Sequence, residues 1–386
     1  MAKVAVCGGG FAAMAAAVRL VSLGHDVTVV THETTLGAPV GSYARDRFRF
    51  DTGPTHVTLP AVLRDLFRKS GPPLEKELDL VPVEPAARYL LADGRTLDLP
   101  NASRAGALRA LTEAFGPGTA GQWDALIRHG EAVWEVLRRS AQDPGRRLSR
   151  RDRRTLAPRT SLQAVLGRGL TQPAARTPLE HLAHEAGSAP HAAPAAMLAR
   201  AYVEQTFGVW RVAGGLHQVV DLLGERISAK ASIRTQAAPD EVRHVVDRAD
   251  VVVIDRTRPT ALPSTTLLAL EGRTTGPAER IVVFPGVSIW SPQDPAMRPP
   301  DGEAWTVQRA VAGGEDVLAV LSSHGYDVRD RLRWRLDVPT PPHPEPASVV
   351  DDDPRRLTIE PVPCLGDGLA YAGMSAAGVA ALIGRA

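Results

Sequence analysis

Three consecutive glycines separate an apolar segment from an alanine-rich segment near the start of the chain. Residues 3–7 are an apolar run that predicts a strand, and the run ends at residues 8–10, which are all glycine. Residues 11–23 have helical spacing, and residues 26–30 form a second, β-branched run. A strand, a glycine turn, a helix and a strand in this order make one βαβ unit. Both strands read as continuous apolar runs, which is typical of parallel strands buried on both faces. The sequence therefore predicts an α/β fold.

The glycine turn occupies the position of a dinucleotide-binding fingerprint. Gly8 allows the tight turn, Gly10 lets a pyrophosphate approach the backbone, and Ala13 is small enough for the helix to pack on the strand. The helix that begins at Phe11 would offer free N–H groups and a positive dipole end to an anion. We therefore expect a Rossmann-like FAD/NAD(P)-binding domain with Gly8, Gly10, Phe11 and Ala13 at the cofactor.

An acidic residue normally ends the second strand of such a unit and binds the ribose hydroxyls. Here Thr31 stands at that position, followed by His32 and by Glu33, which lies two residues late on a turn. A neutral hydroxyl contributes less to binding than a carboxylate does. We include Thr31, His32 and Glu33 among the candidate cofactor-binding residues.

Composition limits the classes of partner and location. A chain of 386 residues with 44% hydrophobic content suits a globular protein of about two domains, and a net charge of +2 gives no reason to expect nucleic acid as a partner. Cys7 and Cys364 form no disulfide framework, which favours a reducing cytoplasm. We expect no signal peptide, no transmembrane segment and no metal site, since His181, His184 and His191 lack further ligands at metal-binding spacing.

The order of strand-like and helical segments suggests two interleaved domains. We expect a dinucleotide-binding domain from residues 1–80, 201–260 and 347–386, and an inserted α+β substrate domain with a helical lid from residues 81–200 and 261–346. Near the C-terminus, residues 369–372 predict a last strand and residues 378–386 a short helix.

The segment Arg138–Arg159 is dense in arginine and contains two prolines. Such a charge run is typical of a solvated, partly disordered connector. The alternative is a docking face for an anionic partner, either a phospholipid surface at the membrane periphery or a carrier protein.

A second motif makes the resemblance to one family specific. Residues 50–54 read Phe-Asp-Thr-Gly-Pro, and residues 36–39 read Leu-Gly-Ala-Pro. The first segment resembles the Phe-Asp-x-Gly-Pro motif of phytoene desaturases and their relatives, which are flavoproteins of the two-dinucleotide-fold class and of the amine oxidase superfamily. The second corresponds to the Gly-Gly-Arg segment of that family, with Pro39 at the arginine. This resemblance adds Gly37, Gly53 and Pro54 to the candidate cofactor site.

The resemblance continues to the end of the chain. Residues 208–216, with their Gly-Gly turn, and residues 249–254 resemble further family segments in the family's order. Ala372-Gly373-Met374 resembles the family's Ala-Gly-Asp motif, with Met374 at the acid, so Gly373 and Met374 join the candidate site. Three charged anchors of the family's FAD are therefore replaced, by Thr31, Pro39 and Met374. Each lost charge-assisted hydrogen bond costs about 1.5–3 kcal/mol.

The resemblance implies an FAD-dependent desaturase or dehydrogenase that acts on a small apolar substrate, such as an isoprenoid, a polyene or another secondary metabolite. The flavin would accept a hydride, while the protein positions the substrate and excludes water. No catalytic residue can be assigned, but Trp210, Tyr202 and His56 are candidates to line the cavity. A packed aromatic or a structural histidine is the simpler interpretation of each.

Two alternatives account for the replaced anchors. One is a redox-neutral isomerase or cyclase that folds an apolar substrate in the same cavity. The other is a flavin-free lipid- or prenyl-binding protein, since Rab GDP-dissociation inhibitors resemble this fold class.

Overall fold

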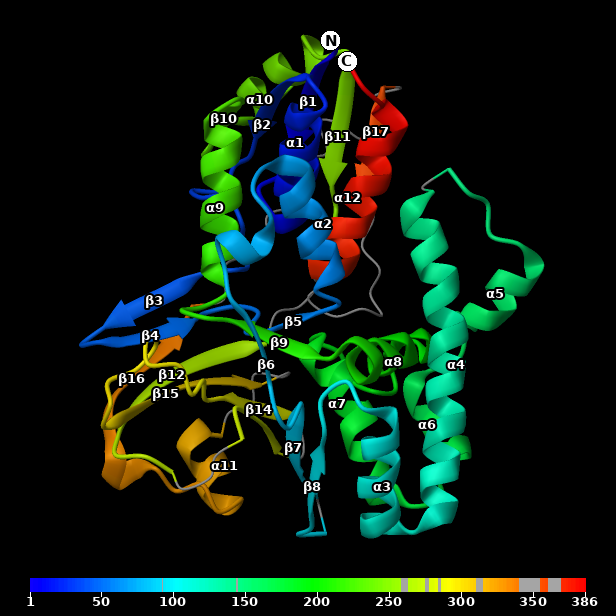
Figure 1. Ribbon diagram of the computed structural model, residues 1–386, viewed down its shortest axis with the longest axis vertical. Helices are drawn as coiled ribbons and strands as arrows, with labels where there is room; N and C mark the ends of the chain where they lie inside the picture. Colours follow the sequence, from blue (N-terminus) through cyan, green and yellow to red (C-terminus); the bar gives the residue numbers. More distant parts are fainter. Residues whose placement is uncertain are drawn as a thin grey trace.

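The computed structural model describes residues 1–386 apart from residues 92, 144, 258–262, 275–277, 284–285, 310–314, 340–354 and 360–368. It is elongated, with one sheet near each end of its long axis, and the two chain termini lie together at one tip (Figure 1). The Ala386 N–H donates to the Leu23 carbonyl at 3.2 Å, which ties the two ends of the chain to one surface.

A parallel five-stranded sheet forms the end that carries the termini. Its strand order is β10 (Ser232–Arg234), β2 (Asp26–Val30), β1 (Lys3–Cys7), β11 (Val251–Asp255) and β17 (Arg356–Ile359). Val4 and Val6 pack with the helices of one face, while Ala5 and Cys7 pack on the opposite face with α10 (Pro239–Asp247). The sheet is therefore buried on both faces, which explains the continuous apolar runs.

Alanine-rich helices cover the first of these faces. The helix α1 (Phe11–Ser22) packs between the sheet and three other helices, namely α2 (Ala61–Ser70), α9 (His217–Ser228) and α12 (Leu369–Ile383). Every residue of α1 from Phe11 to Leu20 is buried. Small side chains make this possible, because they let helices approach closely on several sides of α1.

The second sheet has seven strands and lies at the other end of the molecule. Its order is β16 (Leu332–Val338), β12 (Ser264–Glu271), β15 (Gly302–Arg309), β14 (Val287–Trp290), β13 (Arg280–Val283), β7 (Ala87–Leu90) and β8 (Thr96–Leu99). The β7 and β8 strands form the hairpin expected around Asp93-Gly94, and β13 pairs with β7 in parallel. The helix α11 (Val317–Ser323) packs on this sheet.

Two small sheets lie between the large ones. They pair β3 (Ser42–Arg45) with β4 (Phe48–Asp51), and β9 (Val209–Val212) with β5 (Val57–Thr58) on one side and β6 (Leu80–Pro82) on the other. Four short 3-10 segments complete the described elements: Leu74–Lys76, Pro173–Arg176, Ala195–Met197 and Arg329–Arg331.

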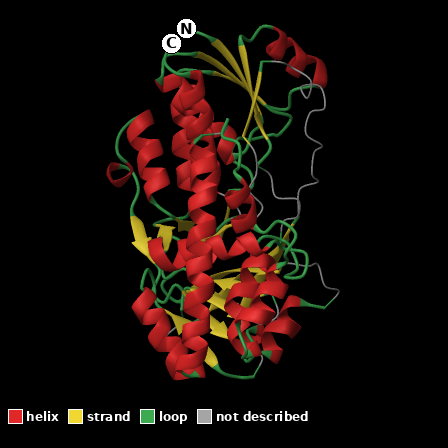
Figure 2. Cartoon of the chain, turned by 90° about the vertical axis from the view of Figure 1, so that its right-hand side faces the viewer, coloured by secondary structure: helices red, strands yellow, loops and turns green. Residues whose placement is uncertain are grey.

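Six helices stand beside the sheets and carry a core of their own. They are α3 (Arg104–Phe115), α4 (Pro117–Gln142), α5 (Arg150–Leu156), α6 (Leu162–Gly169), α7 (Thr177–Glu185) and α8 (Leu198–Phe207). Trp123 and Trp134 of α4 are buried in this core. Figure 2 shows these helices covering the side of the molecule that carries α4. The α/β fold is confirmed, and the division into two interleaved domains at the stated boundaries remains a prediction.

The expected strand at residues 369–372 is wrong, because the helix α12 already begins at Leu369 and runs to Ile383. Ala372, Ala376, Val379 and Ala380 recur at helical spacing and are buried against the core of the first sheet. A short apolar run does not separate a strand from a buried helix by itself, and here the packing of α12 on α1 decides for the helix.

The arginine-rich segment is partly helical in the residues that the structure describes, and partial disorder remains a prediction. The end of α4 and the helix α5 occupy most of this arm, which we define as residues 138–159 (Figure 1). Ser149 and Asp152 form a capping box at the start of α5, and Asp152 also pairs with Arg139 and Arg146. Among the described residues, no helix has the combined length and apolar character needed to cross a bilayer.

Candidate functional site: a glycine turn and an apolar groove

The glycine turn places the start of α1 against the end of β11. Gly8 has φ +135°, a conformation that L side chains rarely adopt, and its N–H donates to the Val30 carbonyl at 3.0 Å. The helix begins directly afterwards, without a side-chain cap from Gly10. Instead, the backbone N–H of Ala13 donates to Asp255 Oδ2 at 3.1 Å. A carboxylate from another strand therefore caps the helix that the sequence assigns to a cofactor phosphate.

Asp255 fills the space that two of the glycines leave open. A Cβ atom on Gly8 would lie 2.8 Å from Asp255 Cβ, and one on Gly10 would lie 2.9 Å from Asp255 Oδ2. Thr257 donates to the other carboxylate oxygen, from its N–H at 2.9 Å and from its hydroxyl at 2.7 Å. Burial raises the pKa of Asp255, and the hydrogen bonds from Thr257 and Ala13 offset part of that effect.

Glu33 reaches the turn although it lies two residues beyond the expected position. A Cβ atom on Gly9 would lie 2.5 Å from Glu33 Oε2 and 2.9 Å from Thr31 Oγ1. Thr31 is buried, and its hydroxyl accepts the Glu33 N–H at 3.2 Å. His32, in contrast, is exposed. The structure therefore brings Thr31 and Glu33 together at the turn, and the acid that appeared displaced in sequence is present there in space.

The segment around Gly37 packs across the turn. The Gly37 N–H donates to the Gly9 carbonyl at 2.6 Å, and Gly37 has φ +97°. A side chain on Gly53 would overlap the Pro39 carbonyl, and Gln308 Nε2 donates to the Gly53 carbonyl at 2.8 Å. Pro54 is buried beside them. These residues hold two loops together close to the turn. Close backbone packing therefore explains why glycines stand at positions 37 and 53.

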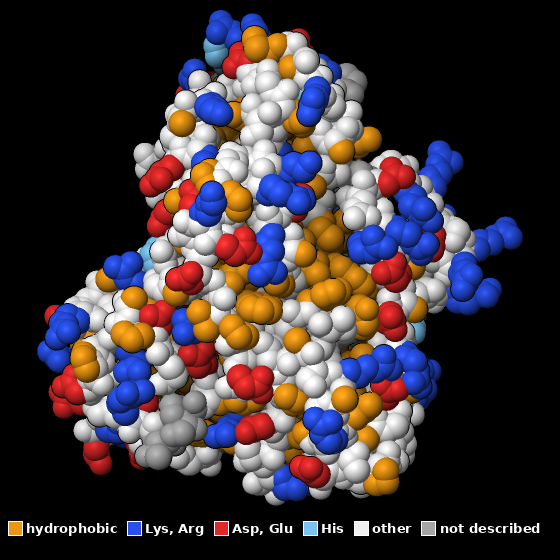
Figure 3. Space-filling model, in the orientation of Figure 1, with side chains coloured by type: hydrophobic (Ala, Val, Ile, Leu, Met, Phe, Trp, Pro, Cys, Tyr) orange, Lys and Arg blue, Asp and Glu red, His pale blue; other side chains and the backbone are white. Residues whose placement is uncertain are grey.

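An apolar groove of about 460 Å³ opens between α12 and α2 on one side and α4 and α8 on the other. Figure 3 shows hydrophobic side chains gathered in a hollow between the end that carries the termini and the arginine-rich arm. The groove is lined by Arg19, Leu59, Ala61, Val62, Asp65, Trp134, Glu135, Arg138, Gln142, Tyr202, Phe207, Gly373, Met374, Ala377, Gly378 and Ala381. A pocket of this size suits a small-molecule ligand.

Gly373, which lines the groove, lies near the side chain of Phe11. A Cβ atom on Gly373 would lie 2.6 Å from Val62 Cγ1 and 3.7 Å from Phe11 Cε1. Gly373 therefore lets α12 approach α2 beside the first residue of α1. Met374 lines the groove with Gly373, and the resemblance had implied a cofactor contact for both residues.

The acidic residues that line the groove are already paired. Asp65 Oδ2 lies 2.8 Å from Arg19 Nη2, and Glu135 Oε2 lies 2.8 Å from Arg138 Nη2. These ion pairs leave the described lining without an unpaired carboxylate, so the groove favours an uncharged, apolar ligand.

Of the three cavity candidates, only Tyr202 lines the groove. Trp210 lies on β9, where its indole N–H donates to the Phe207 carbonyl at 2.8 Å. His56 is buried, with its Nδ1 3.2 Å from Thr55 Oγ1 and its ring 6.0 Å from that of Trp290. Trp210 and His56 therefore lie outside the described lining of the groove, and a role for either in the substrate cavity remains a prediction.

The structure contains a buried network of ion pairs that no sequence pattern predicted. Arg280 of β13 lies 2.7 Å from Glu185 and 3.1 Å from Glu204, and Arg200 pairs with the same two carboxylates. Burial would raise the pKa of Glu185, but the charges of Arg280 and Arg200 outweigh it and hold that pKa well below its ordinary value. The four residues of this ionic network come from α7, α8 and β13. Because β13 is far from the two helices in the sequence, no local motif identifies the network.

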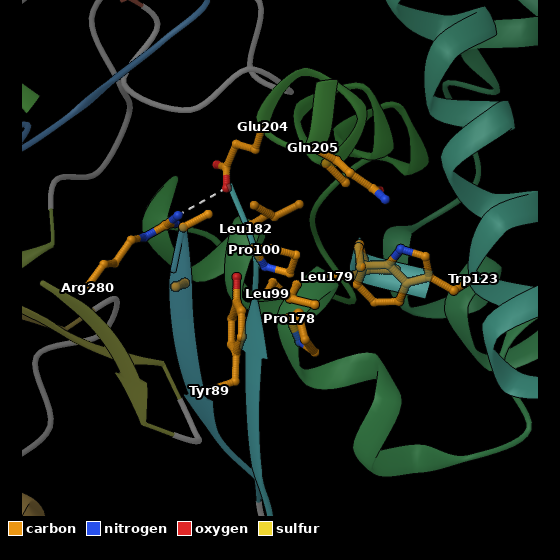
Figure 4. A pocket seen from close by; sticks show the side chains of 14 residues that line it. Tyr89, Leu99, Pro100, Trp123, Pro178, Leu179, Leu182, Glu204, Gln205 and Arg280 are labelled. Carbon is orange, nitrogen blue, oxygen red and sulfur yellow. Dashed lines mark hydrogen bonds and ion pairs between the residues drawn. The ribbon is translucent and has the colours of Figure 1, made fainter. Parts of the chain in front are cut away.

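The network borders a second, smaller cavity of about 40 Å³. Figure 4 shows Arg280 reaching Glu204 at its polar end, with Tyr89, Leu99 and Trp123 among the side chains of its apolar wall. His56, Glu185 and Glu204 also lie close enough together to share a metal ion. Both carboxylates already bind the two arginines, so the arrangement is a salt-bridge network.

The arginine-rich arm stands beside the groove, since Arg138 and Gln142 line it. Six exposed arginine side chains of the arm make no hydrogen bond or ion pair with another described residue: Arg147, Arg150, Arg151, Arg153, Arg154 and Arg159. Figure 3 shows this basic arm projecting next to the apolar hollow. Contact with a membrane surface or a carrier protein through the arm remains a prediction.

Comparison with known proteins identifies the class. Residues 12–261 match the family described as flavin containing amine oxidoreductase, and the chain belongs to this family. The phytoene dehydrogenase of Streptomyces griseus is 31% identical over 266 residues, which cover 66% of this chain and 51% of that protein. The chain therefore spans about half the length of the curated relatives it matches.

Solved structures show the same fold. Putrescine oxidase bound to putrescine matches with a TM-score of 0.66 at 14% identity, over 99% of this chain and 98% of that one. The Rab GDI of Plasmodium falciparum matches with a TM-score of 0.52 at 10% identity, over 86% of this chain and 87% of that one. The sequence-based resemblance and the Rossmann-like fold are both confirmed.

Family membership makes FAD the cofactor of this dinucleotide fold, as the resemblance implied. The described residues fit such a group, because the start of α1 already holds an anion, the Asp255 carboxylate. The turn at Gly8 and Gly10 and the start of α1 would hold the cofactor phosphates, and Glu33 with Thr31 would lie beside them at Gly9.

Proposed function

We propose that the chain is an FAD-dependent desaturase or dehydrogenase that removes hydrogen from an apolar isoprenoid or polyene chain. Bound FAD supplies the two-electron acceptor for this reaction. The observation that carries the proposal is the apolar groove, which begins at Gly373 next to Phe11, the first residue of the phosphate-binding helix.

The lining of the groove distinguishes an apolar substrate from an amine. A cationic amine would find aromatic faces in the groove, but an ion pair that replaces its hydration needs an unpaired carboxylate. In the described lining, Asp65 and Glu135 are each bound to an arginine. An uncharged hydrocarbon needs no such partner, and it gains from leaving water at about 25 cal/mol per Å² of buried apolar surface.

The protein's own part in the reaction is binding, orientation and exclusion of water. Leu59, Val62, Trp134 and Phe207 present apolar surface to the substrate, and Tyr202 adds an aromatic face with a hydroxyl. The described lining contains no histidine. Hydride removal by a cofactor needs no histidine at the substrate.

The related proteins support the same substrate class. The relatives include a phytoene dehydrogenase, a 4,4'-diapolycopene oxygenase and hydroxyneurosporene desaturases. The putrescine oxidases share the fold at 13–14% identity, which carries no argument about substrate.

A blocked groove tests the proposal. The protein is loaded with FAD and titrated without oxygen with phytoene in detergent micelles, and bleaching of the flavin absorbance is recorded. Ala377→Phe places a ring in the groove and should weaken the response to phytoene by ten-fold or more, while FAD affinity stays unchanged. Leu382→Phe is the matched control, because Leu382 lies on the same helix and is 52% exposed.

Three results would contradict the proposal. The first is bleaching by putrescine but not by phytoene, and the second is an Ala377→Phe variant that responds like the wild type. The third is rearrangement of the polyene without any bleaching, which would favour the redox-neutral isomerase or cyclase.

A further inference from the structure

We propose that Asp255 is an internal anion in the phosphate position of the dinucleotide site, so that a dinucleotide binds only when this carboxylate is displaced. The inference concerns the cofactor step on which the proposed function rests, and it does not depend on the substrate.

The position of Asp255 follows from the order of the strands. It is the last residue of β11, and Ile254 before it pairs with Cys7, the residue that leads into the turn. Because parallel strands end at the same edge of a sheet, its side chain meets the turn between β1 and α1. Asp255 Oδ2 lies beside Gly10, the fingerprint position where a pyrophosphate approaches the backbone, and it accepts the Ala13 N–H of the helix that follows.

The two anions compete for the same donors. The Ala13 N–H that binds Asp255 Oδ2 belongs to the first turn of α1, whose free N–H groups bind phosphate in such folds. A phosphate that approached the turn would meet the carboxylate within a few ångströms, and like charges at that distance repel strongly. Thr257 holds Asp255 in place through two hydrogen bonds.

Asp255 is nevertheless able to move. Its named partners are backbone N–H groups and the Thr257 hydroxyl, which are all neutral donors. A rotation of its side chain would therefore break no ion pair among these contacts. We infer that an incoming dinucleotide replaces the carboxylate at α1, and that this exchange lowers the affinity of the wild-type protein for FAD.

ADP is the probe that isolates this step, since it carries the pyrophosphate and adenosine but no flavin ring. We expect Asp255→Asn and Asp255→Ser to bind ADP and FAD at least ten-fold more tightly than the wild type, which corresponds to about 1.4 kcal/mol. Affinity for ADP is measured by calorimetry and affinity for FAD by fluorescence quenching. Without ligand, both variants should melt at a lower temperature, because α1 loses its charged cap.

Asp250→Asn is the matched control. Asp250 lies just before the same strand, and its Oδ2 accepts the Lys3 N–H at 2.8 Å, so it is also a carboxylate that binds a backbone N–H. It lies at the opposite edge of the sheet from the turn, and its replacement should leave both affinities unchanged. Thr257→Val provides a second route, because it removes one donor while Asp255 stays, and it should raise ADP affinity by a few-fold.

Equal affinities for ADP in the wild type and in all Asp255 variants would overturn the inference. So would a loss of affinity in Asp255→Asn, which would make Asp255 a ligand of the cofactor. Either result leaves the phytoene titration to be decided on its own. Conversely, tighter ADP binding without flavin bleaching would support the inference and reject the proposed activity.

Discussion

Asp255 and the pair Glu185 and Glu204 are carboxylates withdrawn from solvent, but they are neutralised in different ways. Glu185 and Glu204 share two buried arginines, which bind both carboxylates. Asp255 has backbone N–H groups and one hydroxyl as its named partners. Removing a buried charge from its counter-charge costs several kcal/mol, whereas a hydrogen bond to a neutral donor contributes about 1 kcal/mol.

The difference separates a permanent structural contact from an exchangeable one. The ionic network joins β13 of the second sheet to α7 and α8, far from the glycine turn in sequence. It can fix the helices that border the groove against the sheet. The contact of Asp255 lies at the turn that the sequence predicts to bind the cofactor, and there we propose that a weaker partner allows replacement by a ligand.

The largest effect is expected for Arg280→Ala. The change leaves Glu185 and Glu204 buried with Arg200 as their one remaining arginine partner, and the free energy of unfolding should fall by about 3–5 kcal/mol. Thermal or urea unfolding measures it. Arg234→Ala is the control, since the Arg234 pair with Glu241 is largely exposed and should contribute at most about 1 kcal/mol. An equal loss of unfolding free energy in the two variants would show that the buried ion pairs stabilise the protein no more than the exposed pair does.

Gly10→Val tests the turn. A Cβ atom there would lie 2.9 Å from Asp255 Oδ2 and 3.4 Å from the Ala38 carbonyl, so the larger side chain displaces Asp255 and also fills the space of a phosphate. We expect ADP and FAD affinity to fall by about 100-fold, which is about 2.7 kcal/mol. Gly121→Val on α4 meets no atom within 4 Å and serves as the control. Unchanged flavin content in Gly10→Val would refute the assigned site.

The smallest effect concerns pH and the histidine beside the network. Burial, together with a smaller effect of the nearby His181, lowers the pKa of His184 to about 4. The folded value lies below the ordinary value of about 6.5, so the unfolded chain takes up a proton first as the pH falls. The contribution of neutral His184 is therefore complete above about pH 6.5 and is lost as the pH falls towards 4.

We expect the melting temperature of the wild type to fall by a few degrees more than that of His184→Gln between pH 7 and pH 5. The exposed His191 provides the control, because His191→Gln should keep the wild-type slope. Parallel slopes for all three proteins would show that His184 is not the titrating group.

Local patterns predicted the parts of the fold that depend on neighbours in the chain. The strand at residues 3–7, the turn at Gly8, the helix from Phe11 and the Asp93-Gly94 hairpin all follow from periodicity and turn chemistry. Residues 369–372 were misassigned because a strand and a buried helix share the same short apolar pattern. Only the packing of α12 against α1 distinguishes them.

The sequence by itself determined the βαβ unit, the family and the position of the phosphate-binding turn, because each depends on residues adjacent in the chain. Tertiary structure alone decided what occupies that turn, since Asp255 lies more than 240 residues away and meets Ala13 only through the strand order of the sheet. It also decided that Glu33 returns to Gly9, that Tyr202 and Met374 share one groove, and that two glutamates meet two arginines. Burial and charge pairing depend on distances in space, and a single sequence does not contain those distances.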